Sequence, residues 1–245
     1  MRGNELLEKM DLIDDKYITE ADTPSGKRSW LPVMAVAACL CLIVGAFVFI
    51  DRQGTTPPVP VLSGKTTAII EFNYKGEIPN IKADLAYLTE EEMFAMNNLL
   101  IFRGTVTELQ NISVTFENQL VVRSIATIRI SKVFQGEISP GDEIKVLLPC
   151  GLDFRMEDTG VIRQIRVGME GIFMPIAYDE TSYMEMYGKV LFLRDLAPCG
   201  LGDGMRWVFL MKDDGTLRFA RFAYPGAKDA HTLEEIEEYI LKMLK

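Results

Sequence analysis

The chain has 245 residues, of which 48% are hydrophobic, and a net charge of −9 at pH 7. This acidic balance argues against a nucleic-acid partner, because phosphate groups attract a basic protein surface. The length leaves room for one domain with a full hydrophobic core and for shorter segments beside it.

Residues 1–30 predict a short amphipathic helix that ends in a turn. Apolar side chains recur at helical spacing in Leu6, Met10, Ile13 and Tyr17. An isolated helix of this length is marginal in water, so its apolar stripe needs a surface to pack against. We expect the stripe to bind a cytosolic protein. A frayed tail next to the membrane is the alternative.

Residues 31–50 form an apolar stretch without a charged residue. As a helix the stretch is about 30 Å long, which matches the hydrocarbon core of a bilayer. It is apolar on all sides, whereas a long helix in the core of a soluble protein is usually amphipathic. The sequence therefore predicts one transmembrane helix, with the lipid bilayer as its partner.

Basic residues precede this span and give its orientation. Lys27 and Arg28 lie at its N-terminal end, and basic flanks stay on the cytoplasmic side. We therefore expect a single-pass protein of the cell membrane, with a cytoplasmic N-terminus and an extracytoplasmic C-terminal domain. Cleavage and lipid attachment at Cys39, which follows Val-Ala-Ala, is the alternative for this segment.

Residues 51–64 are rich in proline and predict a stiff, extended linker. Beyond them, residues 65–245 predict a β-rich domain, because short apolar runs alternate with turn residues. The expected strands are 66–72, 99–108, 112–116, 120–134, 143–148, 161–167, 171–177, 189–193, 206–211 and 217–222. In the fourth of them, Arg123 shares one face with Val121 and Ile125, because side chains alternate along a strand.

Two capping boxes predict helices in this domain. Thr89 with Glu92 begins a short helix, and Thr232 with Glu235 begins a helix that ends near Leu244. The expected fold class is mainly β: a barrel or sandwich with a C-terminal helix, preceded by one transmembrane helix and a short cytoplasmic amphipathic helix.

Two cysteines of the large domain have the same sequence context. Cys150 and Cys199 each stand in a Pro-Cys-Gly-Leu run, and disulfides form outside the cytoplasm. A Cys150–Cys199 disulfide is therefore one prediction, and two free cysteines are the alternative. We expect no metal and no cofactor, because no pair of cysteines has zinc-site spacing and His231 is the only histidine.

The sequence contains no common catalytic motif. It has no Gly-x-Ser-x-Gly elbow, phosphate-binding loop or His-Glu-x-x-His pair. We expect His231 at the surface, near the start of the terminal helix. An enzyme is therefore not expected.

The N-terminal segment resembles a known group of proteins. The run Ile13-Asp14-Asp15-Lys16-Tyr17-Ile18, followed by a basic cluster and an Ala/Cys/Leu-rich span, is similar to the N-terminus of uncharacterised single-span membrane proteins of Gram-positive bacteria. Some of these are described as anti-sigma-factor-like. The resemblance implies a cytosolic partner of the sigma-factor class for the tail. The paired cysteines and histidine of zinc-type anti-sigma proteins are missing.

A second resemblance covers residues 101–178. It rests on Phe102-Arg103-Gly104-Thr105-Val106, on the strand that ends in Val133-Phe134-Gln135-Gly136, and on Gly141-Asp142 and Gly168-Met169-Glu170-Gly171. This pattern resembles an oligonucleotide/oligosaccharide-binding (OB)-like barrel of the netrin and tissue-inhibitor-of-metalloproteinase type. The resemblance implies a fold and leaves the outer ligand unknown.

Together these features predict a membrane-anchored regulatory or sensory protein. Its inner helix is expected to dock a partner, and its outer domain to sense or bind. The alternative is a surface-displayed binding module without a signalling role.

Overall fold

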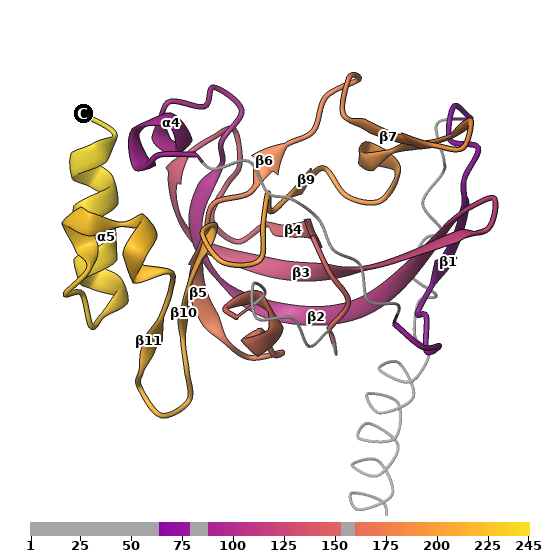
Figure 1. Ribbon diagram of the computed structural model, residues 1–245. Coiled ribbons are helices and arrows are strands. Elements are labelled where there is room, and N and C mark those ends of the chain that lie inside the picture. The colour runs from indigo at the N-terminus through magenta and orange to yellow at the C-terminus, as the bar shows by residue number, and fades with distance from the viewer. Residues whose placement is uncertain (1–63, 79–87, 153–159) are drawn as a thin grey trace, which may run out of the picture. The chain divides into compact units, whose positions relative to one another are not determined.

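The computed structural model describes residues 64–78, 88–152 and 160–245 (Figure 1). The predicted tail helix and the predicted span 31–50 lie outside these residues, as does the linker apart from Gly64. Among the residues that are described, no helix is both long and apolar enough to cross a membrane.

The described part of the chain is mainly β and is built on two long strands. β2 (Ile101–Phe116) and β3 (Gln119–Gln135) pair antiparallel along almost their whole length. Seven further strands join them in one sheet of nine: β1 (Ile69–Phe72), β4 (Glu143–Leu148), β5 (Glu170–Phe173), β6 (Ile176–Ala177), β9 (Cys199–Gly200), β10 (Val208–Met211) and β11 (Leu217–Arg218).

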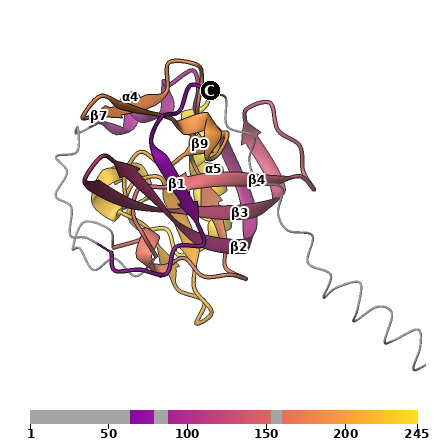
Figure 2. The same cartoon turned by 90° about the vertical axis from the view of Figure 1, so that its right-hand side faces the viewer.

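The sheet curls into a half-barrel (Figures 1 and 2). Its order is β11-β10-β5-β2-β3-β4-β9-β6, and β4 with β9 is a parallel pair. One edge of β2 binds two strands, β5 along its first half and β1 along its second half. An antiparallel bridge joins Ile176 of β6 to Leu99, which lies two residues before the start of β2.

The curvature has a local cause in β2. The β2–β3 register shifts between Arg103 and Gly104 and again between Val106 and Glu108, and such bulges bend a strand and increase its twist. A Cβ atom at Gly104 would lie 2.6 Å from the Arg129 carbonyl oxygen. Glycine at this position therefore permits the close approach of the two strands.

The two faces of the sheet bury two different cores. Ala126 and Ile128 of β3 contribute to the larger core, whereas Val121 and Ile125 contribute to the smaller one. This alternation confirms the period of two expected for the strand. A separate hairpin packs against the smaller core through Leu191: β7 (Tyr183–Met186) with β8 (Lys189–Phe192).

Both predicted helices are present, and both capping boxes are confirmed. α4 (Glu90–Phe94) begins after Thr89, and α5 (Leu233–Met243) begins after Thr232. Each threonine hydroxyl accepts a hydrogen bond of 3.2 Å from the backbone of the glutamate three residues on. Four short 3₁₀ helices complete the described elements: η2 (Ile162–Gln164), η3 (Leu193–Asp195), η4 (Arg221–Ala223) and η5 (Pro225–Ala227).

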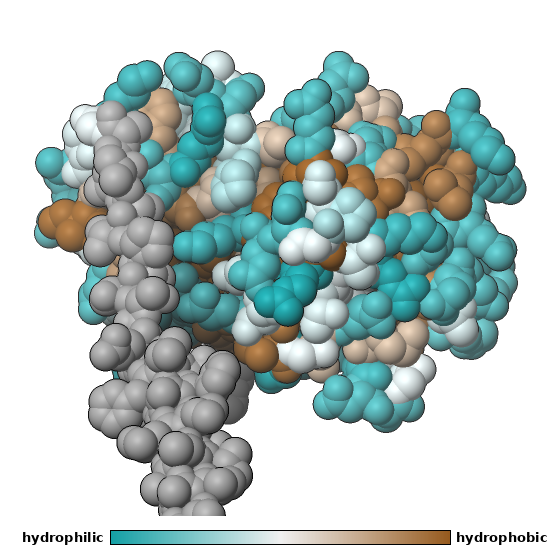
Figure 3. Space-filling model, turned by 180° about the vertical axis from the view of Figure 1, so that it is seen from behind, coloured by the Kyte–Doolittle hydropathy of each residue, from teal (hydrophilic) through white to brown (hydrophobic). Residues whose placement is uncertain are grey.

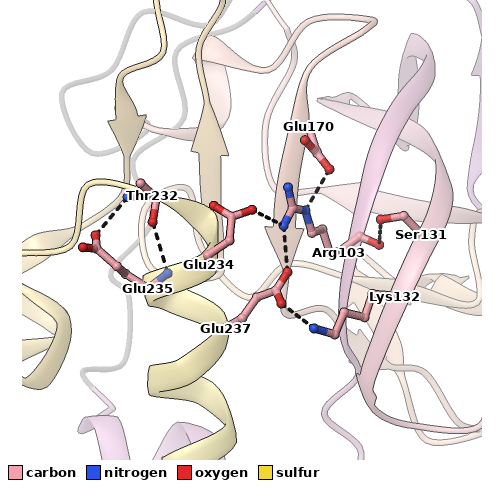
Figure 4. Close-up of polar contacts among 8 residues, drawn as sticks. All are labelled: Arg103, Ser131, Lys132, Glu170, Thr232, Glu234, Glu235 and Glu237. Atoms are coloured by element: carbon pink, nitrogen blue, oxygen red, sulfur yellow. Dashed lines mark hydrogen bonds and ion pairs between the residues drawn. The ribbon is translucent and has the colours of Figure 1, made fainter.

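Charged residues attach α5 to the sheet (Figure 4). Arg103 of β2 donates to Glu234 at 2.7 Å and to Glu237 at 2.8 Å, both on α5, and to Glu170 of β5 at 2.8 Å. Lys132 of β3 binds the second carboxylate oxygen of Glu237. These hydrogen bonds, the one to Glu170 first, raise the pKa of Arg103. The network therefore holds the C-terminal helix beside β2 and β3.

Several strand predictions were wrong. Instead of the strand expected at 161–167, the chain forms the 3₁₀ helix η2; Ile162 in it and Ile165 directly after it are both buried, at the three-residue spacing of a 3₁₀ turn. The strand expected at 171–177 is two strands, because Pro175 has no backbone N–H to donate. The run 217–222 is a strand only at Leu217–Arg218, and 99–108 with 112–116 is the single strand β2.

Candidate functional site

A cavity of about 210 Å³ lies between the sheet and the β7–β8 hairpin. Most of its walls are apolar: Val114, Phe116, Val121, Leu147, Leu148, Pro149, Met184, Leu191, Leu193, Leu196 and Leu201. An apolar cavity of about 150 Å³ is sufficient to bind benzene. The β7–β8 cavity therefore has room for a small organic molecule somewhat larger than benzene.

Strand pairing positions the sheet side of the cavity. Val114 of β2 is the cross-strand partner of Val121 of β3, and Ile125 of β3 is the partner of Leu147 of β4. Directly paired residues point to the same face of a sheet. The apolar wall is therefore a direct product of the register of three adjacent strands.

Backbone hydrogen bonds hold the opposite side in place. The amides of Thr67 and Ala68 donate to the Val190 carbonyl, and the Phe192 amide donates to the Thr66 hydroxyl. The segment before β1 thus fastens β8 over the sheet. The hairpin turns at Tyr187 and Gly188, both with positive φ, as in the tight turns that suit twisted strands.

One charged side chain lies in this apolar wall. Arg123 is largely buried and stands on β3 between Val121 and Ile125, opposite Ile112. Its guanidinium donates to the Pro149 carbonyl. Within the described residues it forms no ion pair with a carboxylate. Burial lowers the pKa of Arg123, yet a guanidinium remains protonated at physiological pH.

Tyr178, directly after β6, forms another wall of the cavity. Burial raises its pKa to about 12, and the charge of nearby Arg123 acts in the opposite direction. A Cβ atom at Gly200 would overlap the Tyr178 hydroxyl. Glycine in β9 thus allows the phenol to lie directly against the strand.

The two cysteines predicted either to pair or to be free are free and buried. Cys199 of β9 is the cross-strand partner of Val146 of β4. Cys150 lies further along the chain, four residues after Val146. The Cys199 thiol donates to the Lys145 carbonyl at 3.5 Å. Burial raises the pKa of Cys150 to about 11 and that of Cys199 to about 12, so neither thiol is an activated nucleophile.

The remaining residues singled out in the sequence are four of the tail and one histidine. Leu6, Met10, Ile13 and Tyr17 lie outside the described residues. His231 is exposed, and its backbone N–H donates to Glu235 at the start of α5. It therefore belongs to the helix cap.

Sequence reasoning missed Arg123 and Tyr178 as site residues. Arg123 left a readable signal, because it stands between the apolar residues Val121 and Ile125 on one face of the strand. Tyr178 left none, because its place beside β9 depends on a strand of two residues that has no periodic pattern.

A second buried charged group has a structural role. Asp203 accepts hydrogen bonds from the Arg206 side chain at 2.7 Å and from the Trp207 indole at 2.9 Å. This arrangement pins the turn before β10. In the part of the chain that the structure describes, no group of three residues is arranged to hold a metal ion.

Apolar residues do not gather into one large patch on the face of the molecule seen from behind. There the visible surface is largely hydrophilic, and apolar residues form small separate patches (Figure 3). Scattered apolar residues of this kind are normal for a protein surface. The β7–β8 cavity is more enclosed than two other hollows formed by described residues, and it is the candidate site.

Fold and cavity together define a mainly β domain with a small, mostly apolar cavity whose described walls contain one cation. Comparisons with known family models and with curated proteins find no match for this chain.

Proposed function

We propose that this chain is a membrane-anchored regulatory or sensory protein whose outer β domain holds a small molecule in the β7–β8 cavity. One observation carries the binding role: an apolar cavity of about 210 Å³ contains a cation, Arg123, without a carboxylate partner among the described residues. Well-packed cores contain few voids of this size, and convergent polar groups in an apolar cavity are typical of ligand sites.

The finer fold assignment is part of the proposal. The half-barrel is an OB-like barrel of the netrin and tissue-inhibitor-of-metalloproteinase type, in which ligands bind across the face of the central strands. The position of the β7–β8 cavity supports this assignment, because Val114, Val121 and Arg123 belong to the two longest strands of the sheet.

The anchor and the tail complete the proposed function. Residues 31–50 span the membrane, which the absence of any charge from that stretch supports. The stripe Leu6, Met10, Ile13 and Tyr17 docks a cytosolic protein of the sigma-factor class, as the resemblance of the tail implies.

Transcript profiling in cells tests the regulatory role. Three full-length variants are compared with wild type: a deletion of residues 4–22, Val121→Phe to fill the cavity, and Val167→Phe as its control. Val167 is 60% exposed and does not line the cavity. We expect the deletion and Val121→Phe to change the same set of transcripts, and Val167→Phe to change none.

Two results would contradict this function. If the deletion leaves all transcripts unchanged, the regulatory role is rejected, and the alternative of a surface-displayed binding module is retained. If Val121→Phe behaves like Val167→Phe, the cavity has no part in the output.

A further inference from the structure

We infer that the molecule held in the β7–β8 cavity is a small monocarboxylate with an apolar body, and that Arg123 binds its carboxylate. The inference rests on the proposed binding role of the cavity and adds the chemical class of the ligand.

The surroundings of Arg123 carry the argument. The guanidinium has five N–H donors, and the only hydrogen bond it forms with described residues is to the Pro149 carbonyl. None of the described residues that line the cavity is acidic. A charge transferred from water into apolar surroundings is costly unless a counter-charge and hydrogen bonds compensate it. A carboxylate supplies both, because its two oxygens match the guanidinium fork.

The polarity of the cavity walls favours a carboxylate over a phosphate group. Apart from Arg123 and Tyr178, the described side chains that line the cavity are apolar. A phosphate group brings about two negative charges and three oxygens that need donors, whereas one guanidinium balances a single charge. The geometry therefore favours one carboxylate attached to a hydrocarbon body that lies against Val114, Val121 and Leu191.

The size of the cavity limits that body. At about 210 Å³ the cavity exceeds the volume that is sufficient for benzene, so a chain of about six carbon atoms is a suitable probe. Hexanoate has the proposed charge, and hexan-1-ol has the same body without it. The pair separates recognition of charge from filling of an apolar space.

A matched pair of arginine variants separates Arg123 from the general charge of the strand. Arg123→Met removes the cation from the cavity. Arg129→Met makes the same change on the same strand, but the Arg129 side chain is 65% exposed, pairs with Glu143 and does not line the cavity. Arg123→Lys keeps the charge and removes the planar fork, and it serves as the second variant if Arg123→Met does not fold.

The test is a ligand-observed NMR titration of the full chain in lipid nanodiscs. Wild type and Arg129→Met should bind hexanoate about 10- to 100-fold more tightly than hexan-1-ol, the range expected for hydrogen bonds to a charged group. Arg123→Met should lose this preference, and Arg123→Lys should keep part of it. Without ligand, Arg123→Met should melt no earlier than wild type, because it removes a largely buried charge that has no counter-charge among the described residues.

Four results would overturn the inference, and they differ in which part of the proposal they leave intact. Equal binding of hexanoate and hexan-1-ol by wild type removes the carboxylate specificity and leaves a binding cavity. Unchanged preference in Arg123→Met, or a much lower melting temperature without ligand, makes Arg123 a structural residue. Binding of neither probe removes the proposed binding role as well.

Discussion

Glu237 of α5 accepts a hydrogen bond from Arg103 of β2 at 2.8 Å, although the Glu237 side chain is only 10% exposed. Its other carboxylate oxygen binds Lys132 of β3. Burial raises the pKa of Glu237, but the hydrogen bonds from Lys132 and Arg103 outweigh burial, and the net pKa lies below the usual value of 4.5. The ionised form of Glu237 is therefore the one that fixes the C-terminal helix to the sheet.

Replacing this carboxylate should destabilise the domain. We expect Glu237→Gln to lower the free energy of unfolding by about 1–3 kcal/mol, because two charge-assisted hydrogen bonds are lost at a buried position. Glu234→Gln is the control: it touches the same arginine, but its side chain is 66% exposed, so a loss below about 1 kcal/mol is expected. Urea unfolding, followed by the fluorescence of buried Trp207, measures both. Equal losses would contradict the assigned role.

The same pair predicts a pH dependence. Because folding lowers the pKa of Glu237, its contribution is fully present above the unfolded value near 4.5 and is lost as the pH falls through the folded value. The stability difference between wild type and Glu237→Gln should therefore shrink below pH 4.5. Unfolding curves at pH 7 and at pH 4 check this, and a constant difference would show that Glu237 acts through packing alone.

The cap of α5 should contribute independently. Thr232→Ala removes the hydroxyl that accepts from the Glu235 amide, which costs about 1 kcal/mol at a typical helix N-cap. Thr232→Ser keeps an accepting oxygen and should remain within a few tenths of wild type. Thermal unfolding of the two variants measures the difference. If alanine and serine have the same effect, the hydrogen bond makes no contribution.

The two cysteines of the β domain should react only after unfolding. Cys150 and Cys199 are free and buried, and burial raises both pKa values, so the reactive thiolate is scarce at neutral pH. Alkylation of never-reduced protein should modify neither residue in the native state and both in denaturant. Peptide mass spectrometry measures the alkylation of each cysteine. A linked Cys150–Cys199 peptide would contradict this prediction and show that the two cysteines form a disulfide in the cell.

The proposed orientation in the membrane is tested on intact protoplasts. Lys27 and Arg28 stand on the N-terminal side of the apolar stretch, which places the tail inside and residues 51–245 outside. External protease should therefore digest the β domain and spare an epitope at the N-terminus. Protection of the β domain until the membrane is lysed would reverse the orientation.

Local signals predicted more of this fold than of its site. The two capping boxes located α4 and α5, and the alternating pattern located β3 almost completely. The strand expected at 189–193 is β8, whereas β7 and the two-residue strand β9 were missed, because their burial depends on what packs against them and leaves no clear period. Apolar periodicity also misread 161–167, where 3₁₀ spacing buries Ile162 and Ile165.

The cavity itself could not be derived from the sequence. Its walls combine β2, β3 and β4 with β7, β8 and η3, which are far apart along the chain. Arg123 was the one readable clue, as a charge between Val121 and Ile125 on one face of the strand. Its meaning depends on the hairpin that covers it, and only tertiary structure supplies that.

The most direct test of the account asks whether the outer cavity and the inner tail act together. A photo-crosslinking residue in place of Met10 of the full-length protein should capture one cytosolic protein in cells. Ile13→Asp with Tyr17→Asp should abolish the crosslink, because burying each large apolar side chain contributes about 1.5–3 kcal/mol. Filling the cavity with Val121→Phe should change the crosslink yield, whereas Val167→Phe should not. The coupling of cavity and tail would be contradicted if the wild-type tail captures no protein. It would also be contradicted if Val121→Phe leaves the crosslink yield unchanged.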